Sequence, residues 1–184
     1  MRVLDVKERD IVLTPDPGYA SYKDAIEVGA GGLCYPVPLT LENNYTPDMD
    51  TVLAQLVKDG YDPKKIKALI VNYPSNPIGA PCSLDYYEHV VAFAKKHGML
   101  VISDVAYSEM VFPGEEKPHS VLEVPGAKDI AVEFHSLSKP YALTASRSSG
   151  SPPSTALKRT NSARVSCEIT CASVVLPEPG GPHR

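Results

Sequence analysis

The apolar run Asp129–Phe134 leads directly into His135-Ser136-Leu137-Ser138-Lys139. This pattern predicts a buried strand that presents hydroxyl groups and one lysine at its carboxyl end. Two other stretches have the same build, an apolar run followed by polar residues: Lys67–Tyr73 before Pro74-Ser75-Asn76-Pro77, and Met99–Ser103 before Asp104-Val105-Ala106-Tyr107. In open α/β sheets, ligands bind outside the carboxyl ends of the strands. The sequence therefore predicts that an amide, a carboxylate, a phenol and an amine meet at one sheet edge.

Strands and helical segments alternate along the first 147 residues, which indicates an α/β fold with a mainly parallel sheet and helices on both faces. The expected strands are Asp10–Thr14, Leu33–Val37, Lys67–Tyr73, Met99–Ser103 and Asp129–Phe134. The turn signal Pro15-Asp16-Pro17-Gly18 is expected to stop the first strand. The expected helices are Tyr19–Val28 with Tyr22, Ala25 and Ile26 on one face, a second helix capped by Thr46 with Pro47 at its first position, and a third capped by Ser83 and ended by Gly98.

Composition fits a globular domain with a core of ordinary size. The chain has 184 residues, of which 43% are hydrophobic and 22% charged, and its net charge of −4 is spread over both signs. These values favour neither nucleic acid nor an anionic membrane as a partner. No apolar run approaches the roughly 18 residues of a membrane span, and the first ten residues contain no apolar signal core, so we expect a cytoplasmic protein.

The four cysteines do not form a recognisable metal site. Cys34 and Cys82 stand alone and are expected to be reduced thiols. The pair Cys167 and Cys171 has no second ligand pair in the sequence, which argues against a bound metal.

The character of the chain changes near Leu143. Residues 144–164 are mostly Ser, Thr, Pro, Arg, Lys and Ala without a lasting helical or strand period, and Pro177–Pro182 interrupts the apolar stretch Val165–Leu176. Such a composition does not bury enough apolar surface to offset the entropy of ordering. We therefore expect a domain at residues 1–147 and an atypical, disordered or poorly packed tail at 148–184.

Each polar residue at the strand ends has two interpretations. Lys139 is either a surface lysine or an amine whose pKa is lowered for attack on an aldehyde. Asp104 is either a cap or a carboxylate that keeps a pyridine nitrogen protonated. Tyr107 is either core or a donor to a ring hydroxyl, and Asn76 either shapes a turn or donates to the same oxygen. Tyr19 is either core or stacks on an aromatic cofactor.

The order of these groups along the chain distinguishes the interpretations better than any single residue does. A carboxylate, an amine, an amide and a phenol are the set that pyridoxal 5'-phosphate chemistry needs. The hydroxyls of Ser136 and Ser138 are either strand-end caps or donors to a phosphate group. Dinucleotide binding is disfavoured, because Gly29-Ala30-Gly31-Gly32 follows a helix and does not open one.

Four motifs resemble those of the fold-type I pyridoxal-phosphate enzymes, specifically the class I/II aminotransferases. In order they are Asp16-Pro17-Gly18-Tyr19 with Tyr22, Asn72–Gly79, Asp104-Val105-Ala106-Tyr107 and Ser136-Leu137-Ser138-Lys139. Glu42-Asn43-Asn44-Tyr45 with Pro47-Asp48, and Glu133–Lys139, resemble the LL-diaminopimelate aminotransferase branch. The resemblance covers roughly residues 8–147 and implies transfer of an amino group between an amino acid and a 2-oxo acid.

The resemblance implies a role for each matching residue. Lys139 would bind pyridoxal 5'-phosphate covalently and then move the substrate proton, and Asp104 would pair with the ring nitrogen. Tyr107 and Asn76 would bond the ring hydroxyl, and Tyr19 would stack on the ring. Ser136 would hold the phosphate, together with Arg147 at the family's spacing of eight residues after the lysine. Members of the family are usually homodimers.

The sequence departs from the family pattern after Lys139. The segment Ala145-Ser146-Arg147-Ser148-Ser149 stands where the family has a Gly-Trp-Arg-Ile-Gly-like run, and the arginine that binds the substrate carboxylate has no counterpart. We therefore expect a fragment of a longer protein whose last residues, 148–184, come from a shifted reading frame. Two functional hypotheses are open: an aminotransferase, possibly of the diaminopimelate branch, and a truncated remnant without catalysis. An alanine or aromatic aminotransferase and a β-lyase of the same fold are alternatives within the first.

Overall fold

The computed structural model describes residues 6–136, 138–139 and 172–175, and its centre is a six-stranded sheet with the strand order β2-β1-β3-β4-β5-β6. The strands are β1 (Ile11–Asp16), β2 (Leu33–Pro38), β3 (Ile66–Val71), β4 (Leu100–Asp104), β5 (Ala131–Ser136) and β6 (Ala172–Val175). Strands β1 to β5 pair in parallel, whereas β6 pairs antiparallel with β5. The predicted mainly parallel sheet is confirmed.

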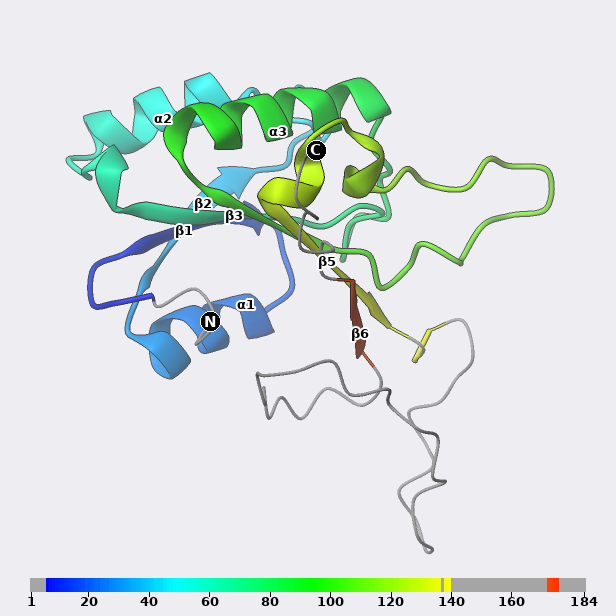
Figure 1. The fold of residues 1–184 in the computed structure, drawn as a ribbon, viewed down its shortest axis with the longest axis horizontal. Helices are drawn as coiled ribbons and strands as arrows, with labels where there is room; N and C mark the ends of the chain where they lie inside the picture. Colours follow the sequence, from blue (N-terminus) through cyan, green and yellow to red (C-terminus); the bar gives the residue numbers. More distant parts are fainter. Residues whose placement is uncertain (1–5, 137, 140–171, 176–184) are drawn as a thin grey trace, which may run out of the picture.

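Helices cover both faces of the sheet, as predicted. The long helices α2 (Met49–Lys58) and α3 (Leu84–His97) lie on one face, and α1 (Ser21–Lys23) with the π-helical turn η2 (Asp24–Val28) lies on the other (Figure 1). Three short 3-10 turns complete the described elements: η3 (Pro63–Lys65), η4 (Val121–Glu123) and η5 (Ala127–Asp129). Among the described residues, no helix is long and apolar enough to cross a membrane.

Strand β3 shows why its sequence is a continuous apolar run. Leu69 and Val71 belong to the large core cluster beneath α2 and α3, while Ala68 and Ile70 belong to a smaller cluster with Val12 and Ile26. Because successive side chains point to opposite faces of a strand, a strand covered on both sides needs apolar residues at every position.

Strand β1 is longer than predicted. The sequence predicts that Pro15 stops it, but it continues to Asp16, which lies opposite Pro38 of β2. The missing N–H of Pro15 is tolerated because β1 pairs with β3 only at Ile11–Leu13, so the far side of Pro15 has no partner strand.

The helical predictions are corrected in detail at two places. Helix α2 begins at Met49, and its N-cap is Asp48, whose carboxylate accepts the Thr51 N–H at 3.0 Å. Thr46 is not the cap, since its hydroxyl donates to the Asn43 carbonyl, and Pro47 lies before the helix. In η2, the Gly29 N–H bonds Asp24 O, and this wider turn leaves Ala25 exposed while Ile26 is buried.

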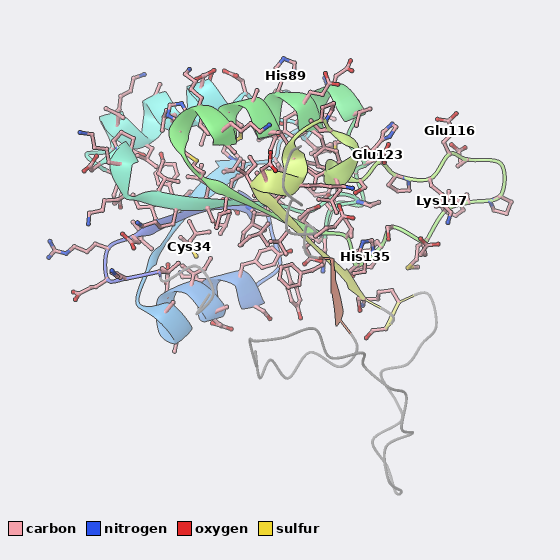
Figure 2. All side chains as sticks on the ribbon, viewed as in Figure 1. Cys34, His89, Glu116, Lys117, Glu123 and His135 are labelled. Atoms are coloured by element: carbon pink, nitrogen blue, oxygen red, sulfur yellow. The ribbon has the colours of Figure 1, made fainter. Side chains whose placement is uncertain are left out.

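The predicted cap of α3 is confirmed. The Ser83 hydroxyl accepts the Tyr86 N–H at 3.2 Å, and Gly98 ends the helix in the left-handed conformation with φ 66°. Cys34 and Cys82 are free thiols, and burial raises their pKa values to about 11 and about 12. Cys34 lies between the sheet and the α1–η2 layer (Figure 2).

Most of the predicted tail, and with it Cys167 and Cys171, lies outside the described residues, so the boundary at 147 stays a prediction. Residues 172–175 form β6, a strand that the sequence analysis did not predict. An edge strand such as β5 offers a row of unpaired backbone groups, and a short β-branched segment can pair with them without a core of its own.

Replacing Gly98 with alanine should lower the free energy of unfolding by about 1 kcal/mol, because a Cβ is disfavoured at positive φ. A Cβ at this position meets no atom within 4 Å, so the backbone conformation alone carries the cost. Urea unfolding measures the change. Gly29→Ala, at φ −78°, is the matched control and should stay within about 0.5 kcal/mol of wild type or stabilise. Equal losses in both variants would contradict this account of the cap.

Candidate active site

Three neighbouring strands end at one edge of the sheet. Strands β3, β4 and β5 pair in parallel and in this order, so the segments that follow them lie side by side. These segments are residues 72–79, 104–107 and 136–139. The edge therefore collects residues from parts of the chain that are about 30 positions apart.

Asp104, the last residue of β4, is held at both carboxylate oxygens. Its Oδ2 accepts the Tyr22 hydroxyl at 2.6 Å, and its Oδ1 accepts the Ala106 N–H at 3.3 Å. Burial, followed by the negative charge of Asp104, raises the pKa of Tyr22 far above its ordinary value. The phenol thus stays protonated and remains a donor, which leaves the carboxylate fixed and still able to accept a further proton donor through its remaining lone pairs.

Asn72 and Asn76 connect the β3 end to the β4 end. Asn72 is 2% exposed, and its Nδ2 donates to the Asp104 carbonyl oxygen at 2.8 Å. Its Oδ1 accepts the Asn76 N–H at 2.7 Å. Asn76, predicted to bind a cofactor, is therefore linked to Asp104 through a single buried side chain.

Lys139 lies against Tyr107. Its Nζ is 5.3 Å from the centroid of the Tyr107 ring, within the range of a cation–π contact. Lys139 is exposed and Tyr107 half-buried, so the amine is accessible from solvent. Ser136 accepts the Ser138 N–H through its Oγ at 3.2 Å, which leaves its own hydroxyl hydrogen available for a ligand.

Tyr19 joins the same group of residues through Tyr22. The two rings meet edge to face, with centroids 5.7 Å apart, and Tyr19 is 50% exposed. Both tyrosines line an open cavity of about 350 Å³ between the carboxyl end of β1 and α1. A half-exposed ring at a cavity wall is free to stack on a flat ligand.

The structure thus brings most of the predicted site residues to one edge. A chain of contacts runs from Tyr19 through Tyr22, Asp104 and Asn72 to Asn76. Lys139 and Tyr107 form a second contact, and Ser136 bonds within its own turn. The remaining predicted residue, Arg147, lies outside the described residues.

Tyr22 and Asn72 fall within the quoted motifs, but their roles do not follow from the sequence alone. Tyr22 was expected on the apolar face of a helix, and its hydroxyl instead reaches a carboxylate 82 positions away. The available signal for Asn72 was a polar residue directly after the run Ala68–Val71, where a buried amide needs partners.

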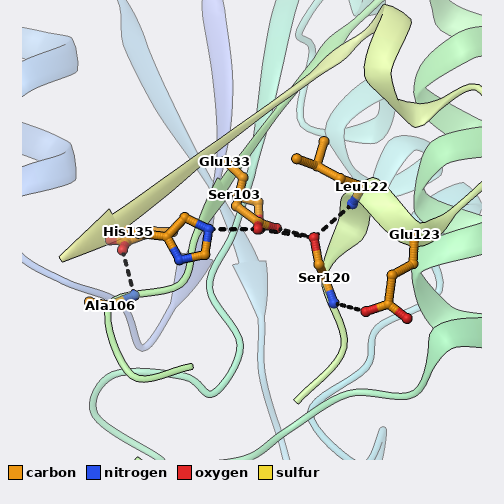
Figure 3. A network of polar contacts seen from close by, with 8 residues as sticks. Ser103, Ala106, Ser120, Leu122, Glu123, Glu133 and His135 are labelled. Carbon is orange, nitrogen blue, oxygen red and sulfur yellow. Dashed lines mark hydrogen bonds and ion pairs between the residues drawn. The ribbon is translucent and has the colours of Figure 1, made fainter. Parts of the chain in front are cut away.

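A second polar network is centred on Glu133 of β5, which is 2% exposed (Figure 3). Its carboxylate accepts the Ser120 hydroxyl at 2.9 and 3.0 Å and the Ser103 hydroxyl at 3.4 Å. His135 Nε2 lies 2.9 Å from Glu133 Oε1. Through Glu133, three residues before Ser136, the network links β5 to β4 and to η4.

Glu133 was missed as a structural anchor by the sequence analysis, although its position gave a signal. An acidic residue inside a buried strand, between Val132 and Phe134, requires partners to offset the loss of hydration. Ser120 supplies one partner and also begins η4, where its backbone N–H donates to Glu123 at 2.6 Å.

Glu133→Gln should lower the free energy of unfolding by about 2 kcal/mol, because His135 and two serines lose a buried charged acceptor. Urea unfolding at pH 7 measures the change. Glu123→Gln is the matched control: its side chain is 48% exposed, and a glutamine still accepts the Ser120 N–H, so the loss should be below about 0.5 kcal/mol. Similar losses for both variants would show that the buried carboxylate has no special role.

Comparison with known proteins identifies the family to which this sheet edge belongs. The model of aminotransferase class I and II matches residues 1–149. The chain belongs to this aminotransferase family. Over 139 residues it is 48% identical to an LL-diaminopimelate aminotransferase of Aquifex aeolicus and 47% identical to LL-diaminopimelate aminotransferase 2 of Trichormus variabilis.

In both alignments, 76% of this chain is covered but only 34% of the relative, so the chain spans about a third of the length of these relatives. A solved structure of a probable N-succinyldiaminopimelate aminotransferase from Thermus thermophilus has a TM-score of 0.65 at 33% identity. That alignment covers 77% of this chain and 36% of the other. The resemblance given by the motifs and the fold class is thereby confirmed.

Proposed function

We propose that this chain carries the cofactor-binding edge of a pyridoxal 5'-phosphate-dependent aminotransferase, which transfers an amino group between an amino acid and a 2-oxo acid. The single observation that carries the proposal is the placement of a carboxylate and an amine at the ends of two adjacent strands. Asp104, held by hydrogen bonds, ends β4, and the accessible Lys139 follows β5. Membership of the aminotransferase family supports it independently.

The donors and acceptors at this edge suit pyridoxal 5'-phosphate in kind. When bound, this cofactor supplies an aldehyde that takes up amines and a ring that stabilises the electron pair left at the substrate carbon. Asp104, with both oxygens already fixed by donors, would accept a hydrogen bond from the protonated ring nitrogen. A carboxylate that does not need to reorganise is well suited to stabilise that positive charge.

Lys139 has two successive roles in the proposal. Its Nζ would hold the cofactor covalently at the aldehyde group. When an amino acid takes its place there, the free amine would accept the proton of the substrate α carbon as a general base and then give it back as a general acid. The neighbouring Tyr107 ring, 5.3 Å from Nζ, keeps the amine at the edge between these roles.

The remaining residues would orient the ring and the phosphate. Asn76 and Tyr107 would donate to the ring hydroxyl oxygen, and Tyr19 would cover one ring face. Ser136 and Arg147 would hold the phosphate, the arginine through a bidentate contact. These roles follow from the motif positions and from the groups that the side chains offer.

For the substrate, we propose LL-diaminopimelate, in the context of lysine biosynthesis. The identities of 48% and 47% to LL-diaminopimelate aminotransferases support this choice. The residues described above would contact the cofactor and not the substrate side chain, so the choice of LL-diaminopimelate over alanine, an aromatic amino acid or a β-elimination substrate rests on the relatives. The proposal includes a homodimer, as the resemblance implies, and a cytoplasmic location, as expected from the sequence.

The test is a spectrum of the purified 184-residue chain with pyridoxal 5'-phosphate, before and after borohydride. A visible band should appear and become a stable covalent adduct, because reduction fixes the carbon–nitrogen bond. Lys139→Ala should abolish the adduct, since Lys139 supplies the reacting amine in the proposal. Lys128→Ala, which removes an exposed lysine of η5, should leave it intact.

The same preparations separate catalysis from binding alone. Formation of glutamate from 2-oxoglutarate, dependent on LL-diaminopimelate and on Lys139, would support the full proposal. An adduct without transfer would favour the non-catalytic alternative. A band that persists unchanged in Lys139→Ala would refute the assignment of the amine.

A further inference from the structure

The side chain of Asn72 makes hydrogen bonds to the backbone of Asp104, at the end of β4, and to the backbone of Asn76, in its own segment. It follows β3 directly and is 2% exposed. Its Nδ2 donates to the Asp104 carbonyl oxygen at 2.8 Å, and its Oδ1 accepts the Asn76 N–H at 2.7 Å. One partner is an acceptor and the other a donor, so only a primary amide of this length satisfies both.

The two partners of Asn72 are the residues proposed to hold two positions of the same cofactor ring. Asp104 would bond the ring nitrogen, and Asn76 would donate to the ring hydroxyl oxygen. The rest of each segment is also fixed. Asp104 is held by Tyr22 and Ala106, and the turn after Asn76 closes through the Gly79 N–H to the Ser75 carbonyl at 2.6 Å.

The spacing between the two segments depends strongly on the bridging amide. Strands β3 and β4 pair from Ala68 opposite Leu100 to Val71 opposite Ser103, and this pairing stops before Asn72 and Asp104. Past that point, the Asn72 side chain supplies the cross-strand hydrogen bond that the ladder no longer provides. Loss of the Asn72 side chain would leave the part-buried Asp104 carbonyl and the part-buried Asn76 N–H without these partners.

We infer that Asn72 is a positioning residue that sets the distance between Asn76 and Asp104 and thereby fits this edge to the cofactor ring. The inference rests on the proposed function, because it concerns how the edge holds pyridoxal 5'-phosphate. The Asn72 side chain hydrogen-bonds to backbone atoms and is not assigned a contact with the cofactor.

The test compares Asn72→Asp and Asn72→Ala with wild type in cofactor titrations. Asn72→Asp keeps the size and the acceptor but loses the donor to the Asp104 carbonyl, whereas Asn72→Ala loses both bonds. Both variants should bind pyridoxal 5'-phosphate about 10-fold more weakly, which corresponds to about 1.4 kcal/mol. A purely structural role would reduce urea stability without changing affinity or spectrum.

The pH dependence of the visible band gives the specific readout. A donor to the ring oxygen draws negative charge from it, so that it stabilises the nearby proton of the carbon–nitrogen group less well. Displacement of Asn76 should therefore raise the pH midpoint of the band by about one unit in both variants. Ser75→Ala is the matched control in the same turn: Ser75 is 4% exposed, and its hydroxyl has no hydrogen-bond partner among the described residues.

The outcomes distinguish the two proposals. If wild type forms the Lys139-dependent band and the Asn72 variants keep its affinity and pH midpoint, the inference is wrong and the proposed function stands. If wild type forms no such band, both fall. If the variants do not fold, hydrogen exchange of the wild-type chain without cofactor tests the bridge instead. The backbone N–H of Asn76 should then exchange with solvent as slowly as the backbone N–H of Gly79. Rapid exchange at Asn76 would overturn the bridge.

Discussion

The parallel pairing of β3, β4 and β5 is the constraint on which the rest of the structure depends. It places three carboxyl ends next to one another, so that residues near positions 76, 104 and 136 become neighbours. The pairing requires strands that are apolar on both faces, since α2 and α3 cover one side and α1 with η2 the other. The chemistry at the edge is thus a consequence of how the core is buried.

Polar side chains supply cross-strand hydrogen bonds at the ends of these strands, where the backbone hydrogen-bond ladder stops. Asn72 joins the β3 and β4 ends, and Tyr22 reaches from α1 to the Asp104 carboxylate. Glu133 joins β5 to β4 and η4 through its hydrogen bonds with Ser103 and Ser120. Each of these groups would be costly to bury without partners, and each has hydrogen-bond partners that hold the strand ends together in the absence of a ligand.

The alternation of apolar runs and polar strand ends was sufficient to predict the parallel sheet, the helices on both faces and the shared edge. Local competition between caps was not predictable: Thr46 and Asp48 are both good N-caps, and Asp48 caps α2 because Asn43 engages the Thr46 hydroxyl. Long-range hydrogen-bond partners could not be predicted either, because Tyr22 and Asn72 both bond to Asp104, which is distant in the sequence and becomes their neighbour only in the fold. The formation of strand β6 depends on the open edge of β5, with which it pairs, more than on any pattern in its own sequence.

Hydrogen exchange with mass spectrometry, with and without pyridoxal 5'-phosphate, tests the central claim that three distant segments form one cofactor site. The account predicts that the cofactor slows exchange together in peptides covering 72–79, 104–107 and 136–139, while peptides covering α2 remain unchanged. Protection of only one of the three segments, or no protection at any of them, would contradict the account.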